Sequence, residues 1–243
     1  MCGRYRLSKT GKQIVEDLAI GDAVEWSPRY NIAPTDYVPV IRQDRQNPSR
    51  TARLMRWGLI PSWAENPAIG ARMIQGMAET AAQKPAFRDA MRTRRCLIPA
   101  DGFYEWADAG AKKKQPYHFG LEADSLFAFA GLWDRWKDKS GEEILSCAIL
   151  TTRANSLVAQ VNDRMPVILR REDYDLWLDP GISDPARTAD LLSPFDSRKM
   201  KSYPVSTRVN SVHNDDPECA QEILLPPPIV QAGLFSSDHD FRS

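Results

Sequence analysis

The chain has 243 residues, enough for one domain with a sizeable core, because folded units of this size bury about seven tenths of the surface that the unfolded chain exposes. Lys plus Arg and Asp plus Glu number 32 each, so no overall charge draws the chain to nucleic acid or to an anionic membrane, and any such partner must be bound by a local patch. No apolar run approaches the roughly 18 residues of a membrane span and the N-terminus does not read as a secretory signal, so we expect a cytoplasmic protein without membrane contact.

The predicted elements begin with a short helix within residues 8–20, where Ile14 and Leu18 lie on one face and Ser8 or Thr10 can cap the first turn. Short strands rich in β-branched, aromatic or aliphatic residues follow at 37–41, 54–60, 96–98, 103–106, 117–121, 127–133, 145–151 and 167–169. Helical patterns interrupt them at 78–91 with a break near Pro85, and at 156–161, 172–178 and 185–192. The pattern predicts an α+β fold with mainly antiparallel sheets.

A run of three prolines marks the end of the predicted domain. Pro226, Pro227 and Pro228 can continue neither a sheet ladder nor a helix. We therefore expect one domain over residues 1–225 and a loosely ordered, Pro-rich tail over residues 226–243.

The cysteines and histidines show no spacing typical of a disulfide framework or a zinc site, so no metal and no cofactor is expected. No two cysteines form a C-x-x-C pair, and we interpret all but the first as ordinary buried thiols. The residues concerned are Cys2, Cys96, Cys147, Cys219, His118, His213 and His239.

The N-terminus carries the first chemical signal. Removal of Met1 would leave Cys2 with a free α-amine beside its thiol. At pH 7 roughly a tenth of such amines are neutral and a few per cent of such thiols are ionised, so both nucleophiles are available. An aldehyde can form a Schiff base with the nitrogen and then close onto the sulfur as a five-membered thiazolidine. The alternative is that Cys2 is only a small residue after the start.

A carboxylate among aromatic residues is the second signal. In a strand over residues 103–106, Glu105 shares a face with Phe103, while Tyr104 and Trp106 point the other way. Loss of solvent raises the pKa of a carboxyl group toward neutrality, which suits a residue that gives and accepts protons in imine chemistry. The alternative is an edge-strand glutamate paired with an arginine.

Several motifs in one order resemble the SOS response-associated peptidase (SRAP) family, and the resemblance covers roughly residues 1–225. The motifs are Cys2-Gly3-Arg4-Tyr5, Tyr30-Asn31-Ile32-Ala33-Pro34, Trp57-Gly58-Leu59-Ile60-Pro61-Ser62-Trp63, Ala78-Glu79-Thr80, Lys84-Pro85-Ala86-Phe87-Arg88, residues 95–106 and Asp163-Arg164-Met165-Pro166-Val167-Ile168-Leu169. Each motif alone would be weak evidence for the family, whereas the full set in this order is specific to it.

The resemblance implies a single domain whose sheets form a pseudo-barrel with flanking helices. It also implies binding of single-stranded DNA, or of single-strand/double-strand junctions, and capture of abasic sites as part of the response to DNA damage. In the family the initiator Met is lost, with self-cleavage as one route, and the N-terminal Cys condenses with the ring-opened sugar to give a thiazolidine DNA–protein crosslink. We expect a monomer.

Transferred residue by residue, the resemblance makes Cys2 the nucleophile and Glu105 the acid/base group. Arg4 and Arg164 match positions that contact backbone phosphate, and Pro34 and Trp63 match an apolar shelf that receives the DNA. A guanidinium can bind phosphate oxygens in pairs, and an aromatic ring can replace lost base stacking. The alternatives are structural ion pairs for the arginines and a packing role for the tryptophan.

The chain departs from the family pattern at three positions. Where the family usually has Asn-Ala-Arg, this chain has Gln75-Gly76-Met77: the amide is kept, but Met77 cannot bind phosphate, which predicts weaker DNA binding and a salt slope smaller by about one unit. Where the family has His, this chain has Asn162, which can form hydrogen bonds but cannot carry a proton near neutral pH.

Three functions therefore remain open. The first is an attenuated crosslinking enzyme with peptidase and lyase-type chemistry, in which Gln75 and Asn162 support Cys2 and Glu105. The second is a reader that binds single-stranded DNA without covalent chemistry. The third is a class II glutamine amidotransferase, which also begins with Cys, although no Asn-Gly pair for the oxyanion segment of such enzymes occurs in this chain.

Overall fold

The structure is a computed structural model that describes residues 3–44, 47–108 and 114–225. Cys2 and the tail predicted over residues 226–243 lie outside the described residues. Within the described ranges, no helix is both long and apolar enough to cross a bilayer.

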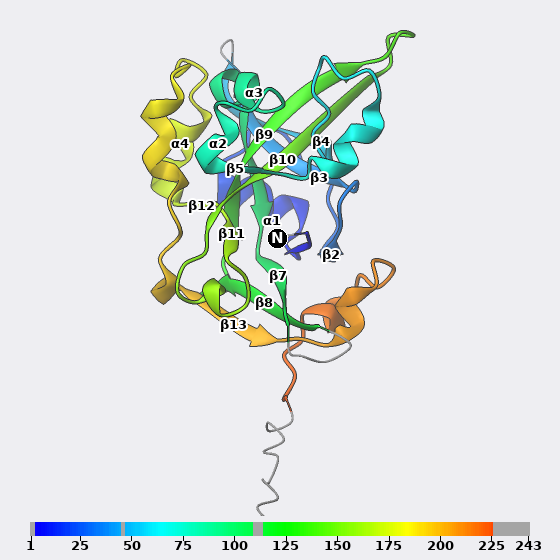
Figure 1. The fold of residues 1–243 in the computed structure, drawn as a ribbon, viewed down its shortest axis with the longest axis vertical. Helices are drawn as coiled ribbons and strands as arrows, with labels where there is room; N and C mark the ends of the chain where they lie inside the picture. Colours follow the sequence, from blue (N-terminus) through cyan, green and yellow to red (C-terminus); the bar gives the residue numbers. More distant parts are fainter. Residues whose placement is uncertain (1–2, 45–46, 109–113, 226–243) are drawn as a thin grey trace, which may run out of the picture.

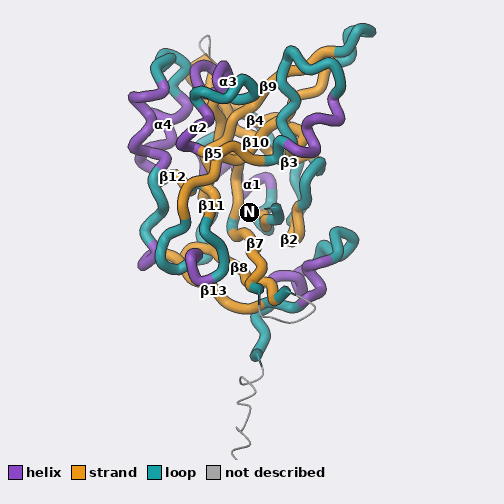
Figure 2. The backbone as a smooth tube through the Cα atoms, viewed as in Figure 1, coloured by secondary structure: helices purple, strands orange, loops and turns teal. Residues whose placement is uncertain are grey.

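Strands form most of the interior, and most of the helices lie at the edges of the fold (Figure 2). The strands are β1 (Tyr5–Leu7), β2 (Arg29–Ile32), β3 (Tyr37–Asp44), β4 (Asn47–Trp57), β5 (Gln75–Met77), β6 (Arg95–Ala100), β7 (Gly102–Ala107), β8 (Gln115–Leu121), β9 (Phe127–Lys137), β10 (Glu143–Arg153), β11 (Arg164–Pro166), β12 (Ile168–Leu169) and β13 (Met200–Pro204). The α-helices are α1 (Gly11–Leu18), α2 (Ala78–Ala81), α3 (Arg88–Thr93) and α4 (Tyr174–Leu178). The 3₁₀ helices are η1 (Pro67–Arg72), η2 (Val158–Gln160), η3 (Arg171–Asp173), η4 (Pro185–Leu192), η5 (Ser197–Lys199), η6 (Thr207–Asn210) and η7 (Pro217–Ala220).

Five strands of the larger sheet close into a barrel. The order β10–β4–β3–β6–β9 returns to β10 through a further pairing between β9 and β10. The long β9–β10 hairpin crosses the barrel and extends beyond it at the upper right of Figure 1. Most pairings are antiparallel, but β10 runs parallel to both β4 and β5. The predicted α+β single domain with a sheet pseudo-barrel is confirmed.

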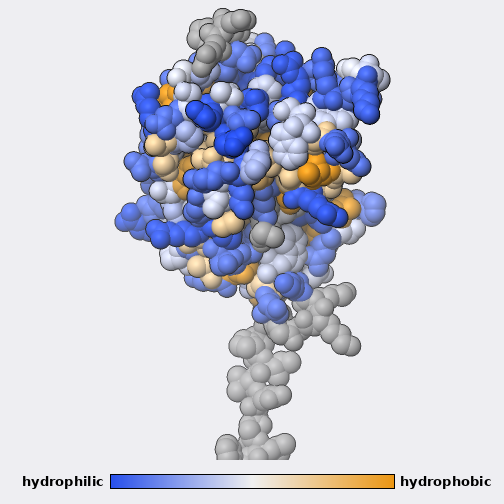
Figure 3. Space-filling view, turned by 45° about the horizontal axis from the view of Figure 1, so that its top comes forward, coloured by the Kyte–Doolittle hydropathy of each residue, from blue (hydrophilic) through white to orange (hydrophobic). Residues whose placement is uncertain are grey.

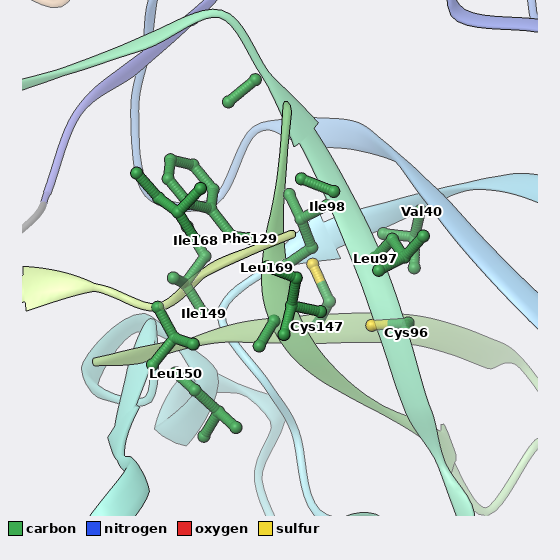
Figure 4. Close-up of a cluster of buried hydrophobic side chains, with 14 of the residues drawn as sticks. Val40, Cys96, Leu97, Ile98, Phe129, Cys147, Ile149, Leu150, Ile168 and Leu169 are labelled. Atoms are coloured by element: carbon green, nitrogen blue, oxygen red, sulfur yellow. The ribbon is translucent and has the colours of Figure 1, made fainter. Parts of the chain in front are cut away.

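Aliphatic, aromatic and thiol side chains form one buried cluster around the barrel strands (Figure 4). Residues from both faces of β3, β6, β9, β10 and β12 contribute to it, and the labelled members are Val40, Cys96, Leu97, Ile98, Phe129, Cys147, Ile149, Leu150, Ile168 and Leu169. Burial raises the pKa of both the Cys96 and the Cys147 thiols, which keeps them protonated and inert. The prediction of ordinary buried thiols holds for these two and for Cys219.

A second, five-stranded sheet has the order β13–β8–β7–β1–β2 and places β7 in its middle. Its β8 and β13 lie at the bottom of Figure 1, with the C-terminal segment in orange beside them. A small separate core under this sheet contains Tyr104, Val205, Val209, Cys219 and Ala220. This core attaches the segment that carries η6 and η7 to β7.

The first helix begins where its capping signal predicts. The Thr10 side chain accepts the Gln13 backbone N–H, and the Gln13 side chain accepts the Thr10 N–H in return. The helical region predicted over residues 78–91 divides at Pro85 into α2 and α3. The strand predicted over residues 54–60 instead ends at Trp57, because Gly58 adopts a positive φ of 132° that breaks the extended backbone.

Candidate functional site

Glu105 lies on the interior strand β7, between β1 and β8, and is only 2% exposed. Its neighbour Phe103 packs into the main core, whereas Tyr104 and Trp106 belong to the smaller one, so the faces alternate as predicted. Burial raises the pKa of the Glu105 carboxyl group, while a hydrogen bond from Asn162 opposes this effect. The direction agrees with the expected proton-exchanging role, and the interior position of β7 contradicts an edge-strand glutamate.

Asn162 contacts Glu105 directly. Its Nδ2 donates to Glu105 Oε2 at 2.9 Å, and its Oδ1 accepts the backbone N–H of Arg164 at 3.1 Å. Because the carboxamide oxygen is already used, the nitrogen is the atom that faces the carboxylate. The residue in place of the family's histidine therefore makes a fixed hydrogen bond to the acid/base candidate.

The C-terminal end of β10 brings Gln75 and Met77, the other two positions that differ from the family pattern, to the same region. On one edge, Thr151 is aligned with Met77 of β5; on the other, Arg153 is aligned with Arg164 of β11. Gln75 is half-buried and Met77 is 50% exposed. Gly76 between them packs against Phe87, where an added Cβ would come within 3.3 Å of the ring.

Arg164 is held by an acidic partner. Its Nη1 and Nη2 donate to the two carboxylate oxygens of Glu79 at 2.8 and 2.9 Å, and Nη2 also donates to the Thr151 carbonyl at 2.7 Å. The bidentate contact with Arg164 holds the pKa of Glu79 below its usual value. The ion-pair alternative considered for Arg164 is therefore present in this structure. Glu79 belongs to the Ala78-Glu79-Thr80 motif, and its role as the partner of Arg164 is one that sequence reasoning missed.

Arg4 is bound by distant backbone. Its Nη1 donates to Asn31 Oδ1 at 2.8 Å and to the Val209 carbonyl at 2.9 Å, and its Nη2 donates to the Asn210 carbonyl at 3.4 Å. Asn31 is fully buried, and its Nδ2 also donates to carbonyls of this segment, including that of Asn214 at 2.7 Å. Asn31 and the C-terminal segment thus hold the start of β1 in place. Sequence reasoning missed this role of Asn31.

Pro34 and Trp63 lie on two loops that meet at Trp57. The turn after Pro34 is tied to Trp57 through Thr35, whose N–H donates to the Trp57 carbonyl at 2.8 Å. Trp63 is 57% exposed, which contradicts a core role for this side chain.

The backbone on both sides of Trp63 is held by β9. Ser62 N–H donates to Asp134 at 3.1 Å, and Trp136 Nε1 donates to the Ala64 carbonyl at 2.7 Å. The exposed ring also lines a cavity of about 540 Å³ together with Asn66 and Arg72. The loop therefore presents an aromatic surface from a fixed backbone.

The structure thus joins Glu105, Asn162 and Arg164 in one hydrogen-bonded chain, with Gln75 and Met77 on a strand beside it. Arg4 approaches from β1, while Pro34 and Trp63 lie on separate loops. Hydrophilic residues cover most of the face shown in Figure 3, with apolar residues in small patches between them.

Comparison with known proteins places this arrangement in a family. The model of the "SOS response associated peptidase (SRAP)" family matches residues 1–212. The chain belongs to this family. The resemblance inferred from the ordered motifs is confirmed.

Similar curated proteins from bacteria and vertebrates are named for abasic site processing. "Abasic site processing protein YoqW" of Bacillus subtilis is 42% identical over 221 residues, which cover 90% of this chain and 98% of that protein. "Abasic site processing protein HMCES" of Xenopus tropicalis is 30% identical, with 84% of this chain and 69% of that protein covered. A solved structure from Bacteroides thetaiotaomicron has a TM-score of 0.83 at 29% identity and covers 92% of this chain and 100% of its own.

Proposed function

We propose that this SRAP-family protein captures abasic sites in single-stranded DNA, or at junctions with double-stranded DNA, through a covalent bond to Cys2. Family membership and relatives named for abasic site processing support the substrate class. The observation that carries the proposal is the buried carboxyl group of Glu105, whose pKa is raised by burial and which is held in place by Asn162.

The pairing of β1 with β7 supports a partnership between Cys2 and Glu105. Tyr5 is aligned with Phe103, and the Tyr104 N–H donates to the Arg4 carbonyl at 3.1 Å. Antiparallel counting then aligns position 3 with Glu105. Cys2 precedes that position by one residue, which is why we assign the glutamate as its acid/base partner.

The proposed chemistry needs only one carboxyl group that gives a proton and takes it back. After Met1 is lost, the Cys2 amine attacks the aldehyde carbon of the ring-opened sugar, and one amine proton moves to the oxygen. Protonated Glu105 gives its proton to the resulting hydroxyl, which leaves as water, and the iminium nitrogen returns its remaining proton to Glu105. The sulfur then adds to the imine carbon, the thiol proton reaches the nitrogen, and a thiazolidine closes. One water is released, and nothing is oxidised or reduced.

The remaining candidate residues bind and orient the DNA. Asn162 and Gln75 provide amide groups at the reacting centre, Arg4 and Arg164 lie near the sugar–phosphate chain, and Pro34 with Trp63 receives unstacked bases. Without a titrating imidazole at position 162, crosslink formation is slowed and its reversal, a lyase-type step, is slowed more. Removal of Met1 by the protein itself is part of this proposal.

The test is incubation of the protein with single-stranded DNA that contains one abasic site, followed by a denaturing gel. We expect a covalent band that is absent with undamaged DNA and absent in Cys2→Ala, and that forms at least ten-fold more slowly in Glu105→Gln. Intact mass of the purified protein reports whether Met1 is gone, because an acylated Cys2 nitrogen cannot form an imine.

Binding without a covalent band, in protein shown by mass to lack Met1, would instead establish the second candidate, a reader of single-stranded DNA. The departures at Gln75, Met77 and Asn162 favour that alternative. Glutaminase activity of the purified protein would point to the amidotransferase alternative.

A further inference from the structure

One face of the short sheet around the end of β10 carries a cation that the sequence motifs do not include. Aligned residues of neighbouring strands point to the same face, as do residues two apart in one strand. Met77 is aligned with Thr151, and Arg164 with Arg153. Met77, Thr151, Arg153 and Arg164 therefore share one face, and the 3.3 Å contact from Arg164 Nη2 to Thr151 Oγ1 agrees with this assignment.

The two arginines on this face differ in what they bind. The Arg164 guanidinium is occupied by Glu79 and the Thr151 carbonyl and is only 17% exposed. Arg153 is exposed, and its guanidinium forms no hydrogen bond or ion pair with the part of the chain that the structure describes. A phosphate would have to displace Glu79 to reach Arg164, whereas it can bind the guanidinium of Arg153 without displacing another side chain.

Space and connection to the site favour the same residue. Arg153 and Glu79 line an open groove of about 540 Å³, so a nucleotide can approach without moving the main chain. The hydrogen-bonded chain from Glu105 through Asn162 ends at Arg164, the strand neighbour of Arg153. A DNA strand that ran from a lesion at Glu105 across Met77 would pass this guanidinium, because Arg153 lies between Met77 and Arg164 on the shared face.

We propose that Arg153 binds a backbone phosphate of the DNA strand next to the lesion and provides the cationic contact that Met77 cannot make. The proposal rests on the proposed function for its ligand. It adds a DNA-binding residue outside the SRAP motifs. The charge of Arg153 then compensates in part for the charge missing at position 77.

The experiment measures binding of undamaged single-stranded DNA by fluorescence anisotropy across a salt series. Each phosphate contact contributes about 0.7 to the slope of log K against log salt for single strands, so Arg153→Gln should lower the slope by about that amount and weaken binding about five-fold near 0.1 M salt. The matched control is Lys139→Gln, which removes an exposed charge at the turn of the β9–β10 hairpin, away from α2 (Figure 1). This control should leave the slope unchanged.

A rescue variant distinguishes lost charge from a damaged fold. Adding Met77→Arg to Arg153→Gln should restore the slope, because it returns a cation to the same face. An Arg153→Gln slope equal to that of the wild type or of the control, or a loss that Met77→Arg does not rescue, would overturn the proposal.

The covalent assay separates this inference from the proposed function. If Arg153→Gln binds normally while abasic DNA is still captured, the role of Arg153 is wrong and the proposed function stands. If the slope falls as expected but the wild type captures no abasic DNA, the phosphate contact stands and the crosslinking function fails.

Discussion

Asn162 and Glu105, which are 57 residues apart, are joined by a 2.9 Å hydrogen bond from the amide nitrogen to the carboxylate. The amide oxygen is bound by the Arg164 N–H, so the side chain cannot turn to present an acceptor instead. Glu105 thus faces a permanent donor that never gives up its proton. This contact both orients the carboxylate and opposes the rise of its pKa caused by burial.

We expect Asn162→His to accelerate covalent capture of abasic DNA and, more strongly, the release of the captured DNA. An imidazole can still donate to Glu105 and can also exchange a proton near neutral pH, and positioned groups of this kind contribute about 10²- to 10⁴-fold. Single-turnover rates from denaturing gels measure both steps. Asn162→Ala is the control and should be slower than the wild type. Equal rates for the His variant and the wild type would show that the amide suffices.

Glu105→Gln should raise the stability of the protein at neutral and alkaline pH while it slows capture. Burial raises the pKa of Glu105 in the folded state above its unfolded value. The protonated carboxyl group therefore makes its full contribution to stability only below the unfolded pKa of about 4.3. This contribution is lost as pH rises through the folded pKa. A neutral amide has no such dependence. Thermal melts of both proteins across pH test this, and the gain in Tm should shrink toward zero as the solution becomes acidic. A variant less stable than the wild type at pH 8 would contradict it.

Met77→Arg should strengthen binding of single-stranded DNA and steepen its salt dependence by about 0.7 in slope, because it adds one phosphate contact. The side chain at position 77 is 50% exposed, so the longer residue can extend into solvent without disturbing β5. Anisotropy titrations in a salt series give the slope. Met77→Gln, which is polar but uncharged, should keep the wild-type slope, and the prediction is wrong if both variants behave alike.

His118 should make the fold sensitive to mild acid. Its ring is fully buried between Tyr104 and Tyr203, with centroid distances of 5.5 and 4.8 Å, and neither ring nitrogen has a hydrogen-bond partner among the described residues. Burial, with further repulsion from Arg6 and Lys201, holds the pKa of His118 well below 6.5. As pH falls below about 6.5 the unfolded chain takes up a proton that the folded chain does not, so up to about 1.4 kcal/mol of stability is lost per pH unit.

Denaturant unfolding at a series of pH values measures this loss. His118→Phe keeps a flat ring between the tyrosines and should remove most of the dependence between pH 6.5 and 5. An unchanged difference between these two pH values in the variant would assign the acid sensitivity to other groups.

Most of the longer strands, including β7 with Glu105, were predictable from local pattern, whereas most of the short strands around the site were not. Alternating and apolar runs predicted the cores of β3, β6 to β10 and β12, since each buries a hydrophobic face. By contrast, β1, β2, β5, β11 and β13 are only three to five residues long and exist because distant strands pair with them. Period-two burial of Tyr5 and Leu7 was the one local signal that could have predicted β1.

The candidate site divides in the same way. Aromatic neighbours on both sides of Glu105 predicted its burial and the direction of its pKa shift, because these follow from strand alternation alone. The contacts of Arg4 with the Val209 and Asn210 carbonyls, and of Arg164 with Glu79, depend on tertiary folding over separations of 205, 206 and 85 residues. No spacing rule links such positions. Arg153 had no motif to mark it and is notable only for the absence of a partner among the described residues.

The anchoring of Arg4 by the C-terminal segment has a consequence for biosynthesis. Ribosomes make the chain from its N-terminal end, so Arg4 is synthesised long before the carbonyl groups at 209 and 210 that bind it. Until those residues leave the exit tunnel, β1 can pair with β2 and β7 but lacks the contacts that hold the Arg4 side chain. Emergence of residues 209 and 210 therefore sets the earliest moment at which the Arg4 side chain can reach its final position.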